Sequence, residues 1–454
     1  MVLNSPWECL FLVGAEWLIC AATRYIGRKA RRRVTLNANR DVWRFGAVLT
    51  AAATRFLSFV TCRIGGCVFG ARDPPSYRSL LWRYLLSSNQ ASTSQVVLAV
   101  EHGGTNPKVD VIDGGGASRL PSGPMPLDLP QFERTREGIA SPTKLPAATI
   151  EALREQVAPL LSEHRPSALG YSFAGPVTAD GIVKSAPNIW GPQVRSVPYA
   201  RMLRDALGMP VAMGNDMWAA ANDIMAHGLA AGLPDVRTFC VITVSSGVGS
   251  KVVLDGRVHL GVSGVAGEIG HMPILLPTEA IPGHRCGCGA PSCVEAGASG
   301  NANAYRARYY AKAFREEHRY TRSRELMEQV AAIGLNPGPH LSRNIMEINA
   351  LICDAARRGD QFALDVVSST LRPLARAVAC VEAEFNVRNY YFIGGFALAL
   401  GEGLLLPVLR QHLAEMTGST YEDLANLGRV YRVEEQTWGL RGVAAAAHSL
   451  LSPQ

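Results

Sequence analysis

Three cysteines within eight residues are the most chemically specific feature of this 454-residue sequence. Cys286, Cys288 and Cys293 follow a histidine, His271, and are separated mainly by Gly and Pro residues. Three thiolates and one imidazole satisfy the tetrahedral preference of a closed zinc site, and Gly and Pro let the backbone turn tightly around an ion. Three free cysteines in a loop are the alternative. The pattern favours a structural Zn²⁺ site, whose four protein ligands leave no open position for catalysis.

Two glycine-rich loops, each placed between apolar runs, could hold phosphate. In the first unit, loop 103–105 lies between the apolar runs 96–100 and 109–112. In the second unit, loop 245–250 lies between the apolar runs 239–244 and 252–254. Each reads as a β-hairpin, and an Asp-Gly turn follows each one. Glycines there let backbone N–H groups approach a phosphate. The repetition, about 140 residues apart, predicts two related lobes.

A third glycine pair, Gly394-Gly395, follows the apolar run 390–393 and precedes a helix-like run, 398–413. The pair would let a strand pass into a helix with a nucleotide base packed nearby. Each of the three loops, taken singly, is more often structural than functional. Together they favour a nucleotide held between two lobes.

Asp216 stands at the end of the apolar run 211–213 and before the Ala-rich, helix-like stretch 217–231. Open α/β sheets place their ligand chemistry at such strand ends. Asp is equally common as a helix N-cap. Both roles remain open from local sequence, and one residue can fill both.

Composition and cysteine usage fit a soluble globular protein of a reduced compartment. Apolar residues make up 48% of the chain, and its charge density is ordinary. Cys240, Cys353 and Cys380 stand alone in apolar surroundings, as buried thiols do. Strands alternate with helices, which indicates an α/β architecture. We therefore expect a cytoplasmic α/β protein.

Residues 1–94 differ from the rest of the chain. They hold 13 Arg plus Lys against 4 Asp plus Glu, a net +9, which leaves about −2 of the total +7 for the remainder. The near-neutral remainder weakens a nucleic-acid interpretation of residues 95–454. Apolar runs 10–22 and 46–53 are too short to span a bilayer. The open alternatives are a membrane-proximal or nucleic-acid-binding arm, a targeting segment, or an appended segment of no settled role.

The motifs together resemble those of the ROK family of sugar kinases and sugar-responsive repressors, over roughly residues 95–450. The shared stretches are Gly-Gly-Thr at 103–105, GND at 214–216, GEIGH from Gly267, and CGCGAPSCVEAGASG ending at Gly300. The resemblance implies an α/β, two-lobed, actin-like ATPase (ribonuclease H-like) fold. It also implies transfer of the γ-phosphoryl group of ATP, with Mg²⁺, to a hydroxyl of a hexose, amino sugar or related polyol.

The resemblance also assigns roles to residues. Asp216 matches the general base, and the sugar contacts match Asn188, Asn215, Glu268, His271 and Glu295. The zinc ligands match His271, Cys286, Cys288 and Cys293. The nucleotide contacts would come from Gly103, Gly104, Thr105, Ser246, Gly247, Gly249, Gly394 and Gly395. The implied lobes are 95–213, completed by the last helix at about 436–454, and 214–435, which carries the zinc loop 267–300.

Three positions depart from the family pattern. Glu101 stands where the family usually has Asp, which moves the carboxylate by one methylene and affects Mg²⁺ placement. Ser245 replaces a glycine of the second phosphate loop. The spacing from His271 to Cys286 is long, and we expect the inserted loop to border the sugar site and to influence which substrate fits.

The kinase interpretation has two alternatives. One is a sugar-responsive repressor with residues 1–94 as its DNA-binding part; the other is a sugar-binding lobe pair with degraded catalysis. No recognition helix is evident between residues 39 and 88, and Asp216 is present, so the sequence favours the kinase. We expect a small sugar or polyol as the substrate, no nucleic-acid partner, no membrane span, and a homo-oligomer, in the form of a dimer.

Overall fold

The computed structural model describes residues 95–103, 106–132, 142–337, 340–387, 389–417, 429–430 and 438–451. All of them belong to one structural unit, Tyr84–Gln454. The predictions for residues 1–94, Gly104 and Thr105 lie outside the described residues. Among the described helices, none combines the length and the apolar character that a membrane crossing requires.

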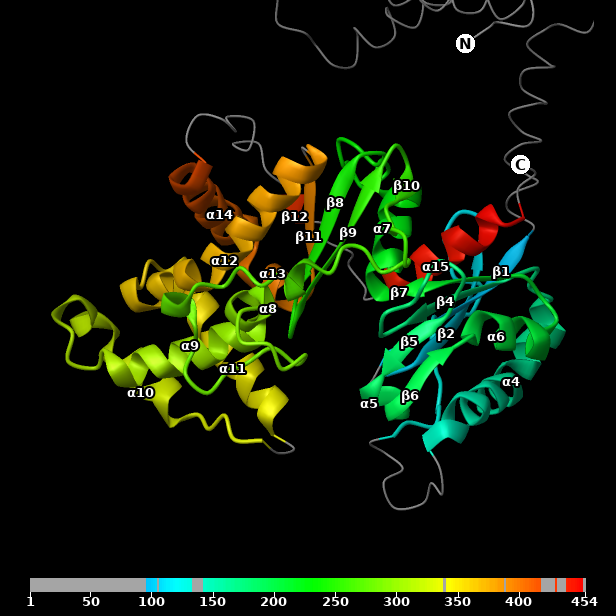
Figure 1. Ribbon diagram of the computed structural model, residues 1–454, viewed down its shortest axis with the longest axis horizontal. Helices are drawn as coiled ribbons and strands as arrows, with labels where there is room; N and C mark the ends of the chain where they lie inside the picture. Colours follow the sequence, from blue (N-terminus) through cyan, green and yellow to red (C-terminus); the bar gives the residue numbers. More distant parts are fainter. Residues whose placement is uncertain are drawn as a thin grey trace, which may run out of the picture. The chain divides into compact units, whose positions relative to one another are not determined.

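The first of two five-stranded sheets carries the amino-terminal hairpin (Figure 1). Its strands, in spatial order, are β3 (Met125–Pro126), β2 (Lys108–Asp113), β1 (Val96–His102), β4 (Leu169–Phe173) and β7 (Val211–Asn215). β3, β2 and β1 pair antiparallel, and β1, β4 and β7 pair parallel. Side chains alternate between the two faces of β1. Leu98 and Val100 therefore pack in the cluster shared with the helices α4 (Leu145–His164) and α6 (Tyr199–Leu207). Val97 and Ala99 pack on the other face, toward α7 (Asp216–His227) and α15 (Trp438–Ser449).

The second sheet repeats this arrangement. Its strands, in spatial order, are β10 (Arg257–Val258), β9 (Val248–Leu254), β8 (Phe239–Val244), β11 (Tyr390–Ile393) and β12 (Arg429–Val430). The first three again pair antiparallel and the last three parallel. Strand order and direction match the first sheet, so the repeat predicted from the two hairpins is confirmed. An actin-like ATPase fold is built from this duplication.

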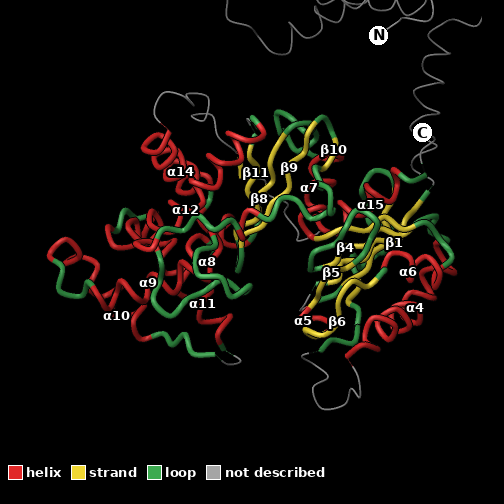
Figure 2. Tube along the Cα trace, viewed as in Figure 1, coloured by secondary structure: helices red, strands yellow, loops and turns green. Residues whose placement is uncertain are grey.

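Helices cover both sheets, as Figures 1 and 2 show. On the first sheet they are α4, α6 and α15, while α7 packs on both sheets. The other face of the second sheet shares one hydrophobic cluster with α9 (Gly300–Ala313), α11 (Leu341–Arg357) and α12 (Gln361–Phe385). Two further strands are β5 (Val183–Ala186) and β6 (Gly191–Val197). The remaining α-helices are α5 (Pro187–Trp190), α8 (Val294–Ala298), α10 (Arg324–Ala332), α13 (Gly395–Leu400) and α14 (Glu402–Thr417). Short 3₁₀ helices occur at Pro142–Lys144, Ile269–His271, Pro277–Glu279 and His318–Ser323.

The carboxyl-terminal helix α15 returns to the first sheet and packs on β1, β4 and α7. Small residues permit this close approach. A Cβ at Gly170 would lie 2.1 Å from the Val443 carbonyl oxygen, and one at Gly442 would lie 1.8 Å from that of Ala219. Both contacts are far below van der Waals distance, so these two positions require glycine. The lobe boundaries near 213 and 435 stay a prediction.

Some elements differ from the sequence expectation at their ends. β9 begins at Val248 rather than near residue 252, which reduces the second phosphate loop to a three-residue turn. The apolar run 398–413 forms parts of two helices, because Gly401 adopts a positive φ of 69° between α13 and α14. A positive φ ends a right-handed helix, and glycine tolerates it without steric cost.

Candidate active site and metal cluster

A cavity of about 520 Å³ collects most of the residues that the sequence singles out. Its lining comes from β1, β7, α7, the β8–β9 turn, the segment after β10, α8, and the β11–α13 junction. The lining residues are Glu101, Asn215, Asp216, Met217, Thr243, Ser245, Ser246, Gly247, Val248, Gly249, Ser250, Glu268, His271, Glu295, Ile393, Gly394, Gly395, Leu398 and Trp438. Segments up to about 330 residues apart in sequence thus meet at one place.

Asp216 is the first residue of α7, and Asn215 is its N-cap. The Asn215 Oδ1 atom accepts a 2.9 Å hydrogen bond from the Trp218 N–H group. Asn215 therefore caps the helix in place of Asp216, whose carboxylate lies in the cavity wall; its role as a base stays a prediction. Gly214 permits the arrangement, since a Cβ there would lie 2.3 Å from the Trp218 ring.

The Asp216 carboxyl group is partly buried in the cavity wall, and the loss of solvation there raises its pKa above the usual range. A hydrogen bond from the Met217 N–H group to Oδ1, 2.9 Å long, and the charge of Lys251 partly offset this effect. A carboxylate whose pKa is shifted toward neutrality is better matched to general-base work than a fully solvated one. The position and the electrostatics of Asp216 therefore suit a base.

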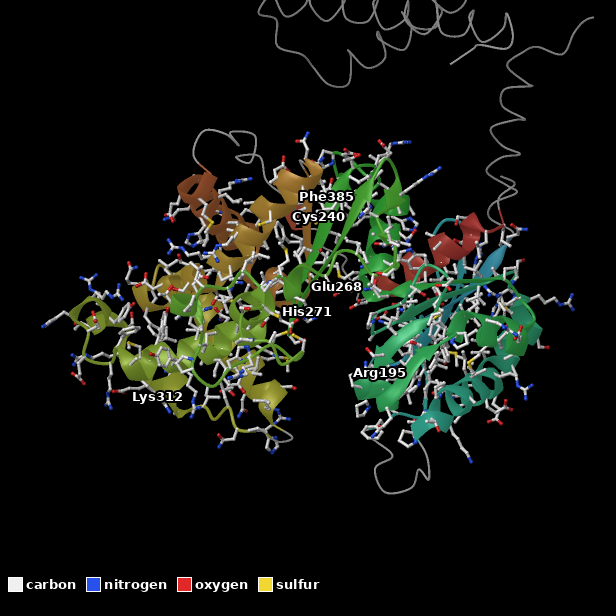
Figure 3. All side chains as sticks on the ribbon, viewed as in Figure 1. Arg195, Cys240, Glu268, His271, Lys312 and Phe385 are labelled. Carbon is white, nitrogen blue, oxygen red and sulfur yellow. The ribbon has the colours of Figure 1, made fainter. Side chains whose placement is uncertain are left out.

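The Gly-Glu-Ile-Gly-His segment lies against β9. A Cβ at Gly267, where φ is 97°, would lie 2.6 Å from the Ser250 carbonyl oxygen, and one at Gly270 would lie 2.0 Å from that of Val248. Both glycines are thus required for the close approach that brings Glu268 and His271 to the cavity (Figure 3). Burial raises the pKa of Glu268, and the Lys251 charge opposes that shift.

The four predicted zinc ligands lie together. One ligand atom from each of His271, Cys286, Cys288 and Cys293 falls within 4.8 Å of all the others. His271 Nδ1 is 3.4 Å from Cys286 Sγ, and the Sγ atoms of Cys288 and Cys293 are 3.5 Å apart. A tetrahedral zinc ion with bonds of about 2.0–2.3 Å separates its ligands by about 3.6–3.8 Å. The donor set and its spacing fit such an ion.

The thiols of the cluster differ in ionisation. Burial raises the pKa of Cys286 and of Cys293. For Cys288, which is exposed, a hydrogen bond from the Ala290 backbone lowers the pKa to about 7. A cation at the cluster favours all three thiolates, because metal binding requires the deprotonated form.

Glu295, on α8, lies between the cluster and the cavity. Its Oε2 atom accepts a 3.2 Å hydrogen bond from the Val248 N–H group, and its Oε1 atom is 3.2 Å from Cys286 Sγ. A Cβ at Gly247 would lie 2.5 Å from Glu295 Oε2. One carboxylate therefore joins the β8–β9 turn to the metal cluster.

The predicted nucleotide-contact residues fall into two groups. Ser246, Gly247, Gly249, Gly394 and Gly395 line the cavity. At Gly394, φ is 94° and a Cβ would lie 2.6 Å from Thr243 Oγ1, so the β11–α13 junction requires glycine there. Gly103 is described but is not part of the lining.

The predictions for Asn188 and for the loop between His271 and Cys286 concern residues that do not appear among the described lining residues of this cavity. Asn188 lies in α5, and its side chain is outside the described residues. The long loop between His271 and Cys286 does not border this cavity. Its residues Leu276, Thr278 and Glu279 line a second cavity of about 780 Å³.

An ion pair holds the loop between His271 and Cys286 away from the first cavity. Both Glu279 carboxylate oxygens accept 2.9 Å hydrogen bonds from the Arg376 guanidinium on α12, and the Glu279 carbonyl oxygen accepts a 3.0 Å hydrogen bond from Arg306 on α9. These bonds fix the loop to the helices of the second sheet. The part of the loop around Glu279 therefore lies away from the first cavity, and its influence on substrate choice stays a prediction.

The sequence analysis did not identify two lysines that lie near the cavity. Lys108 lies opposite Glu101 in the β1–β2 register, and its Nζ atom is 3.2 Å from Glu101 Oε2. Lys251, on β9, is almost fully buried, with Nζ 3.9 Å from Glu268 Oε1. Counting back from the hairpin turn could have paired Lys108 with Glu101. No local pattern marks Lys251.

The duplicated sheets, with a polar cavity lined from both, define a two-lobed α/β protein of the actin-like ATPase class. The chain belongs to the ROK family, whose profile matches residues 130–449. A C(7)-cyclitol 7-kinase of Streptomyces hygroscopicus subsp. limoneus is 37% identical over 275 residues, which cover 60% of this chain and 71% of the kinase. A glucokinase of Aeropyrum pernix is 29% identical over 319 residues, 70% of this chain and 87% of that enzyme.

A solved structure agrees with this assignment. The ROK family glucokinase of Streptomyces griseus, in complex with glucose and AMPPNP, matches with a TM-score of 0.55 and 25% identity. The match covers 78% of this chain and 99% of that one. Homology to these enzymes supports sugar kinase activity in general terms.

Proposed function

We propose that this protein is an ATP-dependent kinase that transfers the γ-phosphoryl group to a hydroxyl of a hexose, amino sugar or cyclitol, with Asp216 as the general base. The observation that carries the proposal is the meeting of Asp216 with Glu268, His271 and Glu295 in one cavity wall, beside the glycine turns at 246–249 and 394–395. The cyclitol enters the proposal because the C(7)-cyclitol kinase is among the relatives.

The residues divide the work by chemical type. Phosphoryl transfer requires positioning and charge stabilisation more than covalent participation by the protein. The Asp216 carboxylate would accept the proton of the attacking hydroxyl. Glu268, Glu295, His271 and the Asn215 Nδ2 group would hold neighbouring hydroxyls, since carboxylates accept hydrogen bonds and the amide donates them.

The nucleotide would lie across the turns at 246–249 and 394–395, whose backbone N–H groups can reach phosphate oxygens. Mg²⁺, when bound, would offset phosphate charge, and Glu101 is the carboxylate placed to approach it. Lys108 competes for Glu101, and burial raises the pKa of this carboxyl group. Glu101 would therefore hold the ion only when its contact with Lys108 leaves a carboxylate oxygen for it.

His271 would have a double role. Its Nδ1 atom faces the cysteine cluster, so its Nε2 atom is the one left for a sugar oxygen. Fixing one ring nitrogen of a histidine sets the orientation and the tautomer of the other. The proposed Zn²⁺ is thus architectural: it would hold the ring in place and take no part in the reaction.

The test is sugar-dependent ATP consumption by the purified protein against glucose, N-acetylmannosamine and a C7 cyclitol. Turnover on one of these, reduced about 10²–10⁴-fold in Asp216→Asn, supports the proposal. The matched control is Asp110→Asn, another acid whose pKa is raised by desolvation, which lies on β2 outside the cavity and should keep turnover within about twofold. Equal losses in the two variants would argue against a base at position 216.

A repressor is the second candidate, favoured by the net charge of +9 on residues 1–94. It requires sugar binding without turnover, together with DNA binding that weakens steeply with salt. Removal of residues 1–94 separates the two candidates. A kinase keeps its turnover, whereas a repressor loses its DNA binding and keeps its sugar affinity.

A further inference from the structure

The described wall of the cavity is strongly acidic. Glu101, Asp216, Glu268 and Glu295 all line it, His271 is the one other titratable side chain among the described lining residues, and neither Lys nor Arg is among them. Four carboxylates close together repel one another, and they repel the phosphates of a nucleotide. A compensating positive charge behind the wall would relieve that repulsion.

Lys251 lies behind this wall. Its side chain is 2% exposed, and it belongs to β9, where residues two apart share a face. Gly249 is its neighbour on that face, and a Cβ at Gly249 would lie 3.3 Å from Met217 Cγ. This face of β9 therefore packs against the first turn of α7, the turn that begins with Asp216.

The Lys251 ammonium group also fastens the segment that carries Glu268. Nζ donates a hydrogen bond to the Ala266 carbonyl oxygen and lies 3.9 Å from Glu268 Oε1. The adjacent Ser250 Oγ donates a 2.7 Å hydrogen bond to the Gly267 carbonyl oxygen. Ser250 and Lys251, which are consecutive in β9, thus both hold segment 266–268. Lys251 carries a charge and Ser250 does not.

The charges around Lys251 act on one another. Burial lowers its pKa, while Glu268 and Asp216 raise it. In return, Lys251 lowers the pKa of both carboxyl groups. Glu101 on β1, itself paired with Lys108, faces Asp216 as a like charge, and His271 and Glu295 act on Glu268.

We propose that Lys251 is a positioning residue of this site: its buried ammonium group holds segment 266–268 and places a positive charge behind the carboxylates of Glu268 and Asp216. Its kinetic consequence rests on the proposed kinase function, whereas its effect on equilibrium sugar binding does not. Lys251 acts through these two carboxylates and does not itself line the cavity.

The test compares pH profiles of kcat/KM for the wild type, Lys251→Gln and Lys251→Arg, with the sugar of highest turnover among glucose, N-acetylmannosamine and a C7 cyclitol. Gln keeps a donor for the Ala266 carbonyl but removes the charge. The acid limb should therefore move toward higher pH by about one unit, roughly a tenfold loss of kcat/KM below the limb. Arg keeps the charge, and its limb should stay within about half a unit of the wild type.

Ser250→Ala is the matched control, because it removes a hydrogen bond to the same segment without changing charge. Its acid limb should coincide with that of the wild type, whatever happens to KM. An unmoved limb in Lys251→Gln, or equal shifts in Lys251→Gln and Ser250→Ala, overturns the inference. If Lys251→Gln does not fold, the limb of Lys251→Arg decides: a displaced limb overturns the inference, and an unmoved one supports it.

Titration calorimetry with the same three sugars separates this inference from the proposed function. A wild type that binds a sugar but never phosphorylates it refutes the kinase. Lys251 is then judged on the pH dependence of the dissociation constant, which should shift by the same one unit in Lys251→Gln and not in Ser250→Ala. A wild type that neither binds nor phosphorylates any of the three overturns both proposals.

Discussion

Replacing Cys288 by serine tests whether the metal cluster holds the sugar-binding wall in place. Cys288 is exposed, whereas Cys286 and Cys293 are buried, so the change removes a ligand without opening a hole in the core. A serine hydroxyl is a poor zinc ligand beside thiolates. We expect the wild type to carry about one zinc per chain and the variant to lose most of it.

The magnitude follows from comparing the cost of ordering the cysteine-rich end of the loop with the small apolar cluster that it contributes to. Fixing the eleven residues 283–293 costs about 11–22 kcal/mol, at about 1–2 kcal/mol per residue. The buried apolar cluster there consists only of Leu275, Cys286, Cys293 and Ala296, with Ala290 packed against it. A structural zinc contributes about 10–16 kcal/mol. The metal is therefore of the size needed to order this segment, and the apolar contacts are not.

Loss of the metal should weaken sugar binding through two side chains. His271 loses the partner that fixes its ring, and Glu295, whose Oε1 atom is 3.2 Å from Cys286 Sγ, loses a fixed neighbour. We expect sugar affinity to fall about 10–100-fold, the usual effect of disturbing the support of a metal-bound histidine. The start of the loop should stay in place, because Glu279 remains paired with Arg376.

The assays are metal analysis of freshly purified, reduced protein, thermal unfolding, and sugar titration by calorimetry. The control is Cys380→Ser, the same change at a partly buried thiol of α12 outside the cluster, and it should leave zinc content and sugar affinity unaltered. Wild-type protein without zinc, or a zinc-free Cys288→Ser variant with normal sugar affinity, would refute the reasoning.

Two further variants probe the cavity itself. Asp216→Asn should raise the melting temperature at pH 8. The pKa of the wild-type Asp216 carboxyl group is raised in the folded state, so the ionised carboxylate destabilises the fold above that pKa. The gain in melting temperature should vanish as the pH falls below the unfolded-state pKa of about 3.9. A lower melting temperature at pH 8 contradicts this. Gly247→Ala should raise KM for the sugar about tenfold, because its Cβ displaces the Glu295 carboxylate, a proposed sugar contact, from the Val248 N–H group. Gly403→Ala, with open space at its Cβ, is the control, and similar KM values in the two variants would count against Glu295 as a sugar contact.

Local sequence indicated many of the elements and the candidate metal-ligand set. The apolar runs that became β8 and β11 could be read from short windows, because the side-chain period of a strand is a local property. The same holds for the cysteine spacing, since three of the four ligands fall within eight residues. The repeated hairpins were also visible, and they predicted the duplicated sheet.

Tertiary structure decided which charges meet. Lys251 became part of the site only because β9 packs on the first turn of α7 and on segment 266–268, an arrangement with no signature in the strand itself. The long loop after His271 was drawn away from the cavity by Arg376, 97 residues from its partner Glu279. Burial and charge pairing depend on contacts between distant segments, so a sequence window can identify the carboxylates of this site but not the buried lysine behind them.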